Sequence, residues 1–286
     1  MKNKKSLYIL LCFLFLLISC QKENFEDSVD DSIITSEAML EVYKPISKET
    51  SEIVTKSFFG SSMDFEFVDG NYILGDMILS EDQITKSNSI EKGTILNNVA
   101  KRWPKSGGIY LVTYSIDGNL PNKQRVTNAI AHWEANTKIR FVNRIYNPYE
   151  PNYIYFTNNG GCSSKIGKVG GQQIISLGNG CSTGNTIHEI GHAVGMFHEQ
   201  SHPQRWRYVD IKWENIEDGK EGNFVKRSYP DVKTTRFNFN SVMMYGSYFF
   251  SKNGLPTILK EDGSTFSVQR NGLSNRDKKV INKIYE

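Results

Sequence analysis

One run, His188 to Glu199, constrains this chain more than any other stretch, and it reads HEIGHAVGMFHE. It fits the pattern H-E-x-x-H-x-x-G-x-x-H. Residues four positions apart on a helix share a face, so His188 and His192 can direct ring nitrogens at one metal ion. Gly195 permits a sharp turn that brings His198 round as a third ligand. The run therefore predicts a metal site built on one helix and the turn after it.

Glu189 follows the first histidine and would lie beside the metal, where a carboxylate can take a proton from bound water. Three protein ligands that leave a fourth position for water are typical of a catalytic zinc. Chance gives the full pattern in roughly 1 in 10⁵ chains of this length. Four of the five histidines fall between His188 and His202, which scattered surface histidines would not do. We predict one catalytic Zn²⁺.

Composition sets the broad class of the protein. The 286 residues suffice for a proper core in one large or two small domains. At 38% hydrophobic and 23% charged, the chain is typical of soluble globular proteins. The net charge of +3 is small and scattered, and no basic stripe with interleaved aromatics is present. We therefore expect no nucleic-acid partner.

The first 20 residues have the pattern of an export signal. Three lysines precede an apolar run, Leu7 to Ile18, that is too short to span a membrane. It ends in Leu17-Ile18-Ser19-Cys20, which resembles the lipobox of bacterial lipoproteins, whose cysteine is lipidated after cleavage before it. The alternative is an ordinary secretory signal with a coincidental cysteine. Both predict export, with membrane contact only through a lipid on Cys20.

Two further cysteines, Cys162 and Cys181, lie in the part of the chain that would be exported, where thiols tend to pair. A bridge closing a loop of this size stabilises by about 3 kcal/mol in the chain-entropy model. Two free buried thiols are the alternative.

Secondary structure can be predicted in outline. Residues 21–55 are polar and indicate a tether with one short helix, Ser36–Tyr43, and Phe65–Gly75 has the pattern of a hairpin turning at Asp-Gly-Asn. A compact α+β domain is predicted from Trp103 onward. Its strands are expected at 109–116, 139–143, 153–157 and 172–177, and its helices at 121–137, from 183–185 onward, at 213–226 and at 275–285.

The chain resembles the astacin family of zinc endopeptidases, within the metzincins, from about Trp103 to its last residue. Besides the zinc run, family-like blocks are GQQIISL at 171–177, IKWENI at 211–216, SVMMYG at 241–246 and QRNGLS at 269–274. A bacterial subgroup with lipoprotein-type signals is the nearest likeness. The resemblance implies a twisted, mostly parallel sheet with an antiparallel edge strand, an active-site helix and a Met-turn, preceded by a prosegment.

The resemblance also implies roles for individual residues. Met243 matches the methionine beneath the zinc site, and Tyr245 the tyrosine that binds zinc at rest and swings toward the oxyanion. Glu199 matches the acid that receives the freed N-terminal ammonium, and Cys162 and Cys181 match one of the family's two disulfides. The three zinc ligands and the catalytic base correspond to His188, His192, His198 and Glu189.

A prosegment over residues 21–92 and a catalytic domain over 93–286 follow from the same resemblance. Ile73-Leu74-Gly75-Asp76 resembles the family motif F-x-G-D, with Ile in place of Phe, and its aspartate occupies the open zinc position. On its own, Gly-Asp is only a turn signal. The family's usual spacing places the activating cut near Lys92-Gly93, so we expect an activating protease as a partner.

Two departures from the family pattern bear on the site. The family continues H-E-x-x-R-x-D-R-D, but here the run proceeds through His202, Gln204 and Trp206, and only Arg205 survives of the charged set. Met244 stands where a histidine is common. We expect these changes to alter support or subsite shape without abolishing activity.

The predicted function is peptide-bond hydrolysis in proteins or peptides by an exported, latent zinc endopeptidase. Many relatives favour an acidic residue just after the cut. The substrate is expected to extend the sheet at Gln172–Leu177. One alternative is a zinc-retaining binding module with weak catalysis, against which Glu189 and Tyr245 argue. Another is a structural surface lipoprotein, against which the complete set of metal ligands argues.

Overall fold

The computed structural model describes residues 40–46, 50–87, 101–227 and 236–286. The signal with Cys20, the proposed cut at Lys92-Gly93 and residues 36–39 of the predicted first helix lie outside the described residues. The rest of that predicted helix, Leu40–Tyr43, is a turn followed by bends, so the helix prediction is wrong there.

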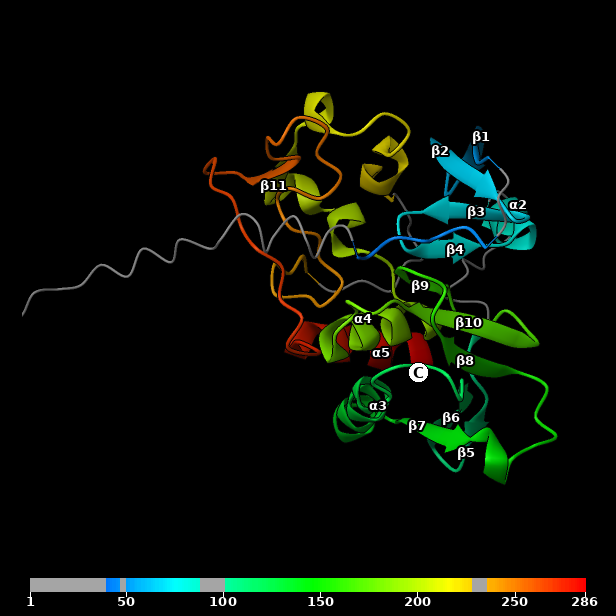
Figure 1. Cartoon of the computed structure of the whole chain (residues 1–286). Coiled ribbons are helices and arrows are strands. Elements are labelled where there is room, and N and C mark those ends of the chain that lie inside the picture. Colours follow the sequence, from blue (N-terminus) through cyan, green and yellow to red (C-terminus); the bar gives the residue numbers. More distant parts are fainter. Residues whose placement is uncertain (1–39, 47–49, 88–100, 228–235) are drawn as a thin grey trace, which may run out of the picture.

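A mostly parallel sheet forms the centre of the molecule (Figure 1). Its parallel strands are β7 (Ile139–Asn143), β6 (Ile109–Ile116), β8 (Tyr153–Thr157) and β10 (Gln172–Leu177), paired in that order. All four have the predicted bounds. The antiparallel strand β9 (Cys162–Lys165) pairs with β10, and short β5 (Lys105–Ser106) pairs with β6. The α+β architecture with an antiparallel edge strand is confirmed.

Three helices pack against this sheet: α3 (Gln124–Asn136), α4 (Thr183–Ala193) and α5 (Asn275–Tyr285). Ser182 caps α4 and Ser274 caps α5, each in a reciprocal capping box. The first helix begins at Gln124, later than predicted, because Asn122 has a positive φ of 48° that no α-helix contains. Buried Trp133 of α3 donates its ring N–H to the carbonyl of Ile187 on α4 at 3.1 Å, which locks these helices together.

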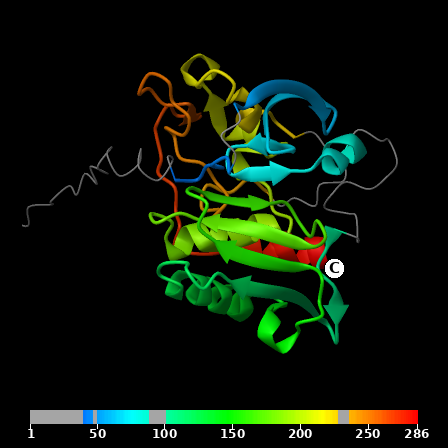
Figure 2. The ribbon, with the colours of Figure 1, turned by 45° about the vertical axis from the view of Figure 1, so that its right-hand side comes forward.

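The described residues 40–46 and 50–87, here called the N-terminal segment, are more ordered than their polar composition suggested. They form β1 (Glu52–Phe58), β2 (Ser61–Val68), β3 (Asn71–Leu74), β4 (Met77–Leu79) and α2 (Glu81–Ser87). The predicted hairpin is confirmed as β2–β3, and its turn residues Asp69 and Gly70 both have positive φ. Strand β4 pairs in parallel with β9, so this meander continues the central sheet (Figure 2).

The chain after the active-site helix has little regular structure. It contains 3₁₀ turns, among them Trp213–Asn215 and Glu221–Phe224, and the strand pair β11 (Val209–Ile211) and β12 (Ile258–Lys260). The predicted helix at 213–226 is wrong. Gly219 adopts a φ of +81°, and a Cβ at Gly222 would lie 2.2 Å from the carbonyl oxygen of Asp64, so the backbone turns and passes close to β2 there. No helix among the described residues is long and apolar enough to cross a membrane.

Candidate active site

Three histidine side chains converge at the end of α4. His188 and His192 lie on one face of the helix, one turn apart. Gly195 follows with a φ of +102°, as the predicted turn requires, and the chain returns with His198. The Nε2 atom of His198 lies 3.2 Å from that of His192 and 3.3 Å from that of His188. All three rings are buried.

The other ring nitrogens orient two of these histidines. His188 donates Nδ1–H to the carbonyl of Val242 at 2.7 Å, and His192 donates to that of Met196 at 2.9 Å. Their Nε2 lone pairs are therefore free to face the common centre. Burial lowers the pKa of His198 to about 3, which keeps this ring neutral. Three imidazole rings whose Nε2 atoms meet at one point are a donor set that fits zinc.

Met243 packs directly beneath α4. A Cβ at Gly191 would lie 2.8 Å from the Met243 sulfur, so the small residue lets the loop approach the helix. The Met243 carbonyl accepts the N–H of Glu199 at 2.9 Å, and Ser241 donates its hydroxyl to Asp277 of α5 at 2.6 Å. The loop is thus tied to both sides of the histidine cluster, where the resemblance placed a methionine platform.

Two buried side chains beside the histidines lack hydrogen-bond partners among the described residues. They are the carboxyl of Glu189, at both oxygens, and the hydroxyl of Tyr245. Burial, together with the charges of Asp76 and Glu41, raises the pKa of Glu189 well above its usual range. Burial likewise raises the pKa of Tyr245, which keeps the phenol protonated as a donor. The Tyr245 ring lies 4.3 Å from that of His198.

Asp76 completes the cluster from the N-terminal segment. Its Oδ2 lies 3.1 Å from Nε2 of His188, and its Oδ1 lies 3.1 Å from Nε2 of His198 and 3.6 Å from that of His192. Burial alone would raise the pKa of Asp76, but its close contacts with His198 and His188 hold that pKa well below the usual range. One ligand atom from each of the four residues falls within 4.8 Å of the others, so the set can hold a metal ion.

Gly75 lets Asp76 reach this position. Its φ is +64°, and a Cβ there would lie 2.6 Å from the Tyr245 hydroxyl oxygen and 2.9 Å from Oδ1 of Asn223. Any larger residue would meet both backbone strain and these two atoms. Ile73, which replaces the usual Phe of the motif, is buried in a small cluster with Val68, Ile78 and Tyr43.

The N-terminal segment also covers strand β9. The N–H of Cys162 donates to the carbonyl of Leu40 at 2.7 Å, and that of Ser164 donates to the carbonyl of Asp76 at 2.9 Å. The predicted substrate edge, Gln172–Leu177, is wrong, because β10 has β8 on one side and β9 on the other. The strand that this segment covers is β9.

A disulfide bond fixes β9 relative to α4. Cys162 and Cys181 are joined, as predicted, with their Cα atoms 6.0 Å apart. Cys162 begins β9, and Cys181 precedes the capping residue Ser182 of α4. The covalent link therefore runs between the covered strand and the start of the helix that bears the histidines.

Glu41 forms a buried contact that sequence reasoning missed. Its carboxylate makes a bidentate ion pair with the guanidinium of Arg270 and accepts the side-chain N–H of Asn185 at 2.8 Å. Asn185 lies three residues before His188 on α4, so this ion pair borders the histidine cluster. Glu41 stood in the sequence as one of many acids in a polar stretch, with no local signal to single it out.

Comparison with known proteins decides the family. The model of the peptidase family described as Astacin matches residues 95–286. This chain belongs to the astacin family. Its histidine run, its methionine loop and the tyrosine after it lie within the matched range.

Similar astacin-family proteins come from animals. Blastula protease 10 of Paracentrotus lividus is 38% identical over 232 residues, covering 74% of this chain and 38% of that protein. Zinc metalloproteinase nas-15 of Caenorhabditis elegans is 36% identical over 208 residues, covering 70% and 35%. This chain thus matches little more than a third of either relative.

One solved astacin-family structure supports the fold. High choriolytic enzyme 1, a hatching enzyme zinc-protease from Oryzias latipes, is 33% identical, with a TM-score of 0.60. The match covers 66% of this chain and 96% of that one.

Several residues after His198 depart from the astacin pattern, and Arg205 is the one that remains of its charged set. Arg205 is buried and donates to two backbone carbonyls, those of Gln200 at 2.8 Å and Phe224. Burial lowers its pKa to about 10. His202 accepts the N–H of Gln204 at 3.0 Å, and Trp206 is exposed. Met244, which stands where the family often has a histidine, is buried in a hydrophobic cluster whose members lie between Val209 and Ile258 in the sequence.

Glu199 accepts the backbone N–H of Asn238 at 2.8 Å. Burial, with the nearby Asp277 carboxylate, raises its pKa to about 8. The role of Glu199 in receiving a freed N-terminal ammonium stays a prediction, because its contact in this structure is with a backbone amide.

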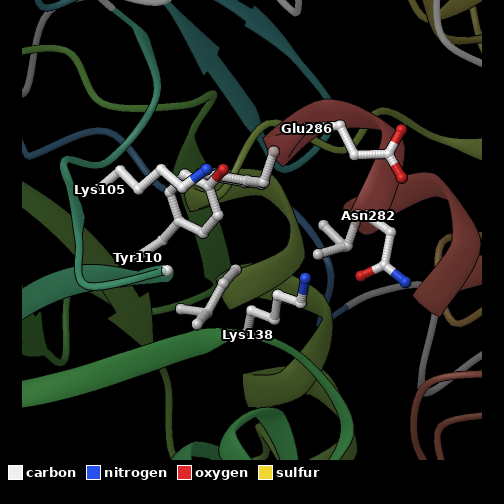
Figure 3. A pocket seen from close by; sticks show the side chains of 9 residues that line it. Lys105, Tyr110, Lys138, Asn282 and Glu286 are labelled. Carbon is white, nitrogen blue, oxygen red and sulfur yellow. The ribbon is translucent and has the colours of Figure 1, made fainter.

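Cavities lie away from the histidine cluster, and two of them are larger than the third. One, of about 540 Å³, is lined by Tyr43 and Glu66 of the N-terminal segment and by Lys220 and Phe250 of the C-terminal part. The other, of about 230 Å³, lies between β6 and α5, with two lysines and Glu286 at its rim (Figure 3). Neither contains a residue of the metal cluster.

Proposed function

We propose that this chain is a zinc-dependent endopeptidase that is made as a latent precursor. The observation that carries the proposal is the position of the Asp76 carboxylate, within 3.1 Å of two of three converging histidine nitrogens. The histidines supply the resident ligands, and Asp76 takes the place that water and substrate need. The same cluster therefore accounts for both catalysis and latency.

Two residues, Glu189 and Tyr245, carry out the chemistry; their buried polar atoms have no hydrogen-bond partner among the described residues. Zinc, when held by the histidines, lowers the pKa of a bound water and polarises the substrate carbonyl. Glu189 accepts the proton of the attacking water and returns it to the leaving amine. Tyr245, kept protonated by burial, donates its hydroxyl hydrogen to the developing oxyanion. Met243 supports the histidine helix from below.

The chain is divided accordingly into a signal (1–20), a prosegment (21–92) and a catalytic domain (93–286). Cleavage near Lys92-Gly93 removes the N-terminal segment and supplies an ammonium group for Glu199. The lipobox-like residues support membership of a bacterial lipoprotein subgroup with a lipid on Cys20. Cleavage would then release the catalytic domain from the membrane.

Substrates are proteins or peptides bound in extended form along β9. The ion pair between Glu41 and Arg270 supports an acidic preference just after the cut, because Arg270 would lose its buried carboxylate partner when the segment leaves. A substrate carboxylate would replace it.

The decisive experiment measures hydrolysis of a quenched peptide library after limited trypsin treatment. Glu189→Gln should lower kcat/KM by about 10²–10⁴-fold while bound zinc, measured by metal analysis, is unchanged. Exposed Glu214→Gln is the matched control and should retain activity, and a zinc chelator should abolish it. Full activity in Glu189→Gln would disprove the assigned role. Bound zinc with no hydrolysis in the wild-type protein would favour the binding module.

A further inference from the structure

Four cations of the C-terminal two thirds of the chain face the N-terminal segment. Arg270 pairs with Glu41, Lys220 pairs with Glu66 at 2.5 Å, and Lys101 pairs with Asp82 at 2.9 Å. Arg227 is 4% exposed and has no carboxylate partner among the residues that the structure describes. Within the described ranges, the other members of this set each have a carboxylate partner, whereas the buried charge of Arg227 has none.

The contacts of Arg227 leave hydrogen-bond donors unused. Its guanidinium carbon lies 3.9 Å from the centre of the Phe197 ring and 6.0 Å from that of Phe58, and Nη2 lies 3.8 Å from the Met77 sulfur. Its Nε and Nη1 have no hydrogen-bond partner in the described part of the chain. Burial lowers the pKa of Arg227 to about 9, which reflects the cost of holding this charge away from water. Guanidinium is a planar, bidentate partner for carboxylates, and here that capacity is unfilled.

Two of the groups that cover Arg227 belong to the segment that cleavage would remove. Phe58 ends β1 and Met77 begins β4, whereas Phe197 precedes the third histidine and would stay. Departure of the segment would uncover one side of the guanidinium while its stacking on Phe197 remains. Arg227 would then face the space over β9 that the segment had filled, here called the groove.

Arg227 and Arg270 lie toward opposite ends of β9. Met77, which touches Arg227, directly follows Asp76 and pairs with Ser164. Glu41, which binds Arg270, directly follows Leu40, whose carbonyl is bonded to Cys162. Strand β4 runs parallel to β9. A substrate running antiparallel to β9 would run in the opposite direction, from the Ser164 end of β9 toward the Cys162 end. Residues before the scissile bond would then lie at the Arg227 end.

We propose that Arg227 is a specificity-determining residue that binds the carboxylate of an Asp or Glu side chain located before the scissile bond. This inference rests on the proposed function, because it needs the segment to leave. It adds a second subsite for an acidic substrate residue, on the side of the cut opposite to Arg270. Good substrates would therefore carry acidic residues on both sides of the bond that is cut.

The test uses cleaved protein and matched peptides that differ only by Asp or Glu against Asn or Gln at positions before the cut. Wild-type protein should favour the acidic peptide by about 10- to 100-fold in kcat/KM, the range of a hydrogen bond to a charged group. Arg227→Gln should lose most of this ratio, and Arg227→Lys should keep part of it. Exposed Arg207→Gln, which removes a cation outside the groove, should leave the ratio unchanged.

A binding measurement separates this inference from the proposed function. Cleaved Glu189→Gln protein should bind the acidic peptide more tightly than the neutral one, and adding Arg227→Gln should remove the difference, whether or not hydrolysis occurs. Absence of any acidic preference before the cut in wild-type protein would overturn the inference, even if both Arg227 variants failed to fold. An equal ratio in folded Arg227→Gln and wild type would also overturn it.

Discussion

Tyr245 brings a hydroxyl into the histidine cluster with no hydrogen-bond partner among the described residues. A buried donor without an acceptor is unfavourable, which supports the proposed use of this hydroxyl in the reaction. Replacing Tyr245 by Phe should lower kcat about 10²-fold with little change in KM, since the donor acts on charge that develops only in the transition state. Steady-state kinetics on cleaved protein measure this, with Tyr208→Phe as the control. An equal loss in both variants would contradict the assignment.

Gly75 combines a positive φ with close approach to Tyr245, whereas Gly70 has a similar φ of +70° but nothing within 4 Å of its missing Cβ. Gly75→Ala should therefore loosen the hold of Asp76 and raise hydrolysis by the uncleaved chain about 10-fold, as backbone strain plus a clash costs at least about 1.4 kcal/mol. Gly70→Ala carries the strain without the clash and should leave the uncleaved chain latent. Equal hydrolysis by the two uncleaved variants would show that the contact with Tyr245 is irrelevant to latency.

The residues of the histidine run could be assigned from the sequence because one helix and one turn hold them all. Their mutual distances follow from helical geometry alone. Glu41 and Arg270 are 229 positions apart, and no local pattern links them. The burial of Arg227 likewise could not be predicted, because Phe58 and Met77, which contact it, are far away in the sequence.

Among the elements, α3 carries a histidine suited to a direct test of linkage. His132 accepts the N–H of Leu273 at Nε2, at 2.9 Å, so that nitrogen must be unprotonated in the folded chain. Burial, with the nearby charge of Lys278, lowers the pKa of His132. The unfolded chain, with an ordinary histidine pKa near 6.5, therefore takes up a proton before the folded chain does.

Folded stability should consequently fall as pH drops below about 6.5 and level off below the depressed pKa of His132. Glutamine at this position keeps an acceptor but cannot titrate, so His132→Gln should flatten this part of the profile. Urea unfolding of the full chain between pH 7.5 and 5 measures it, and Ala131→Gln on the same helix should keep the wild-type slope. An unchanged slope in His132→Gln would rule out this source of acid sensitivity.

The elements that the sequence predicted well are those whose pattern is local. Strands β6, β7, β8 and β10 are rich in β-branched and aromatic residues, and their bounds were correct. Strand β9, Cys-Ser-Ser-Lys, lacks that pattern and exists because both of its neighbours pair with it. The predicted helix at 213–226 failed because close packing against β2 at Gly222 overrides local helix propensity.

At the scale of the whole molecule, the N-terminal segment is held at several independent places. Its own core, which includes Phe58, Phe65 and Leu79, packs against Phe197 and Val225. Strand β4 pairs with β9, and two glutamates of the segment bind Arg270 and Lys220. Asp76 is therefore one contact of a broad interface, and its loss alone should not detach the segment.

The uncleaved Asp76→Ala chain should accordingly hydrolyse small peptides faster than the uncleaved wild-type chain but still at least about 10-fold more slowly than the cleaved wild type. The carboxylate would be gone from the histidines, yet the segment would still cover β9, whose backbone groups an extended substrate needs. Adding Glu41→Gln should raise the rate further, since it weakens the hold on Arg270 at the other end of the strand. Asp64→Ala, a substitution within the segment itself, should leave the chain latent. The measurement is the rate of small-peptide hydrolysis by chain that has been verified as uncleaved. If the uncleaved Asp76→Ala chain were as fast as the cleaved enzyme, the carboxylate alone would maintain latency.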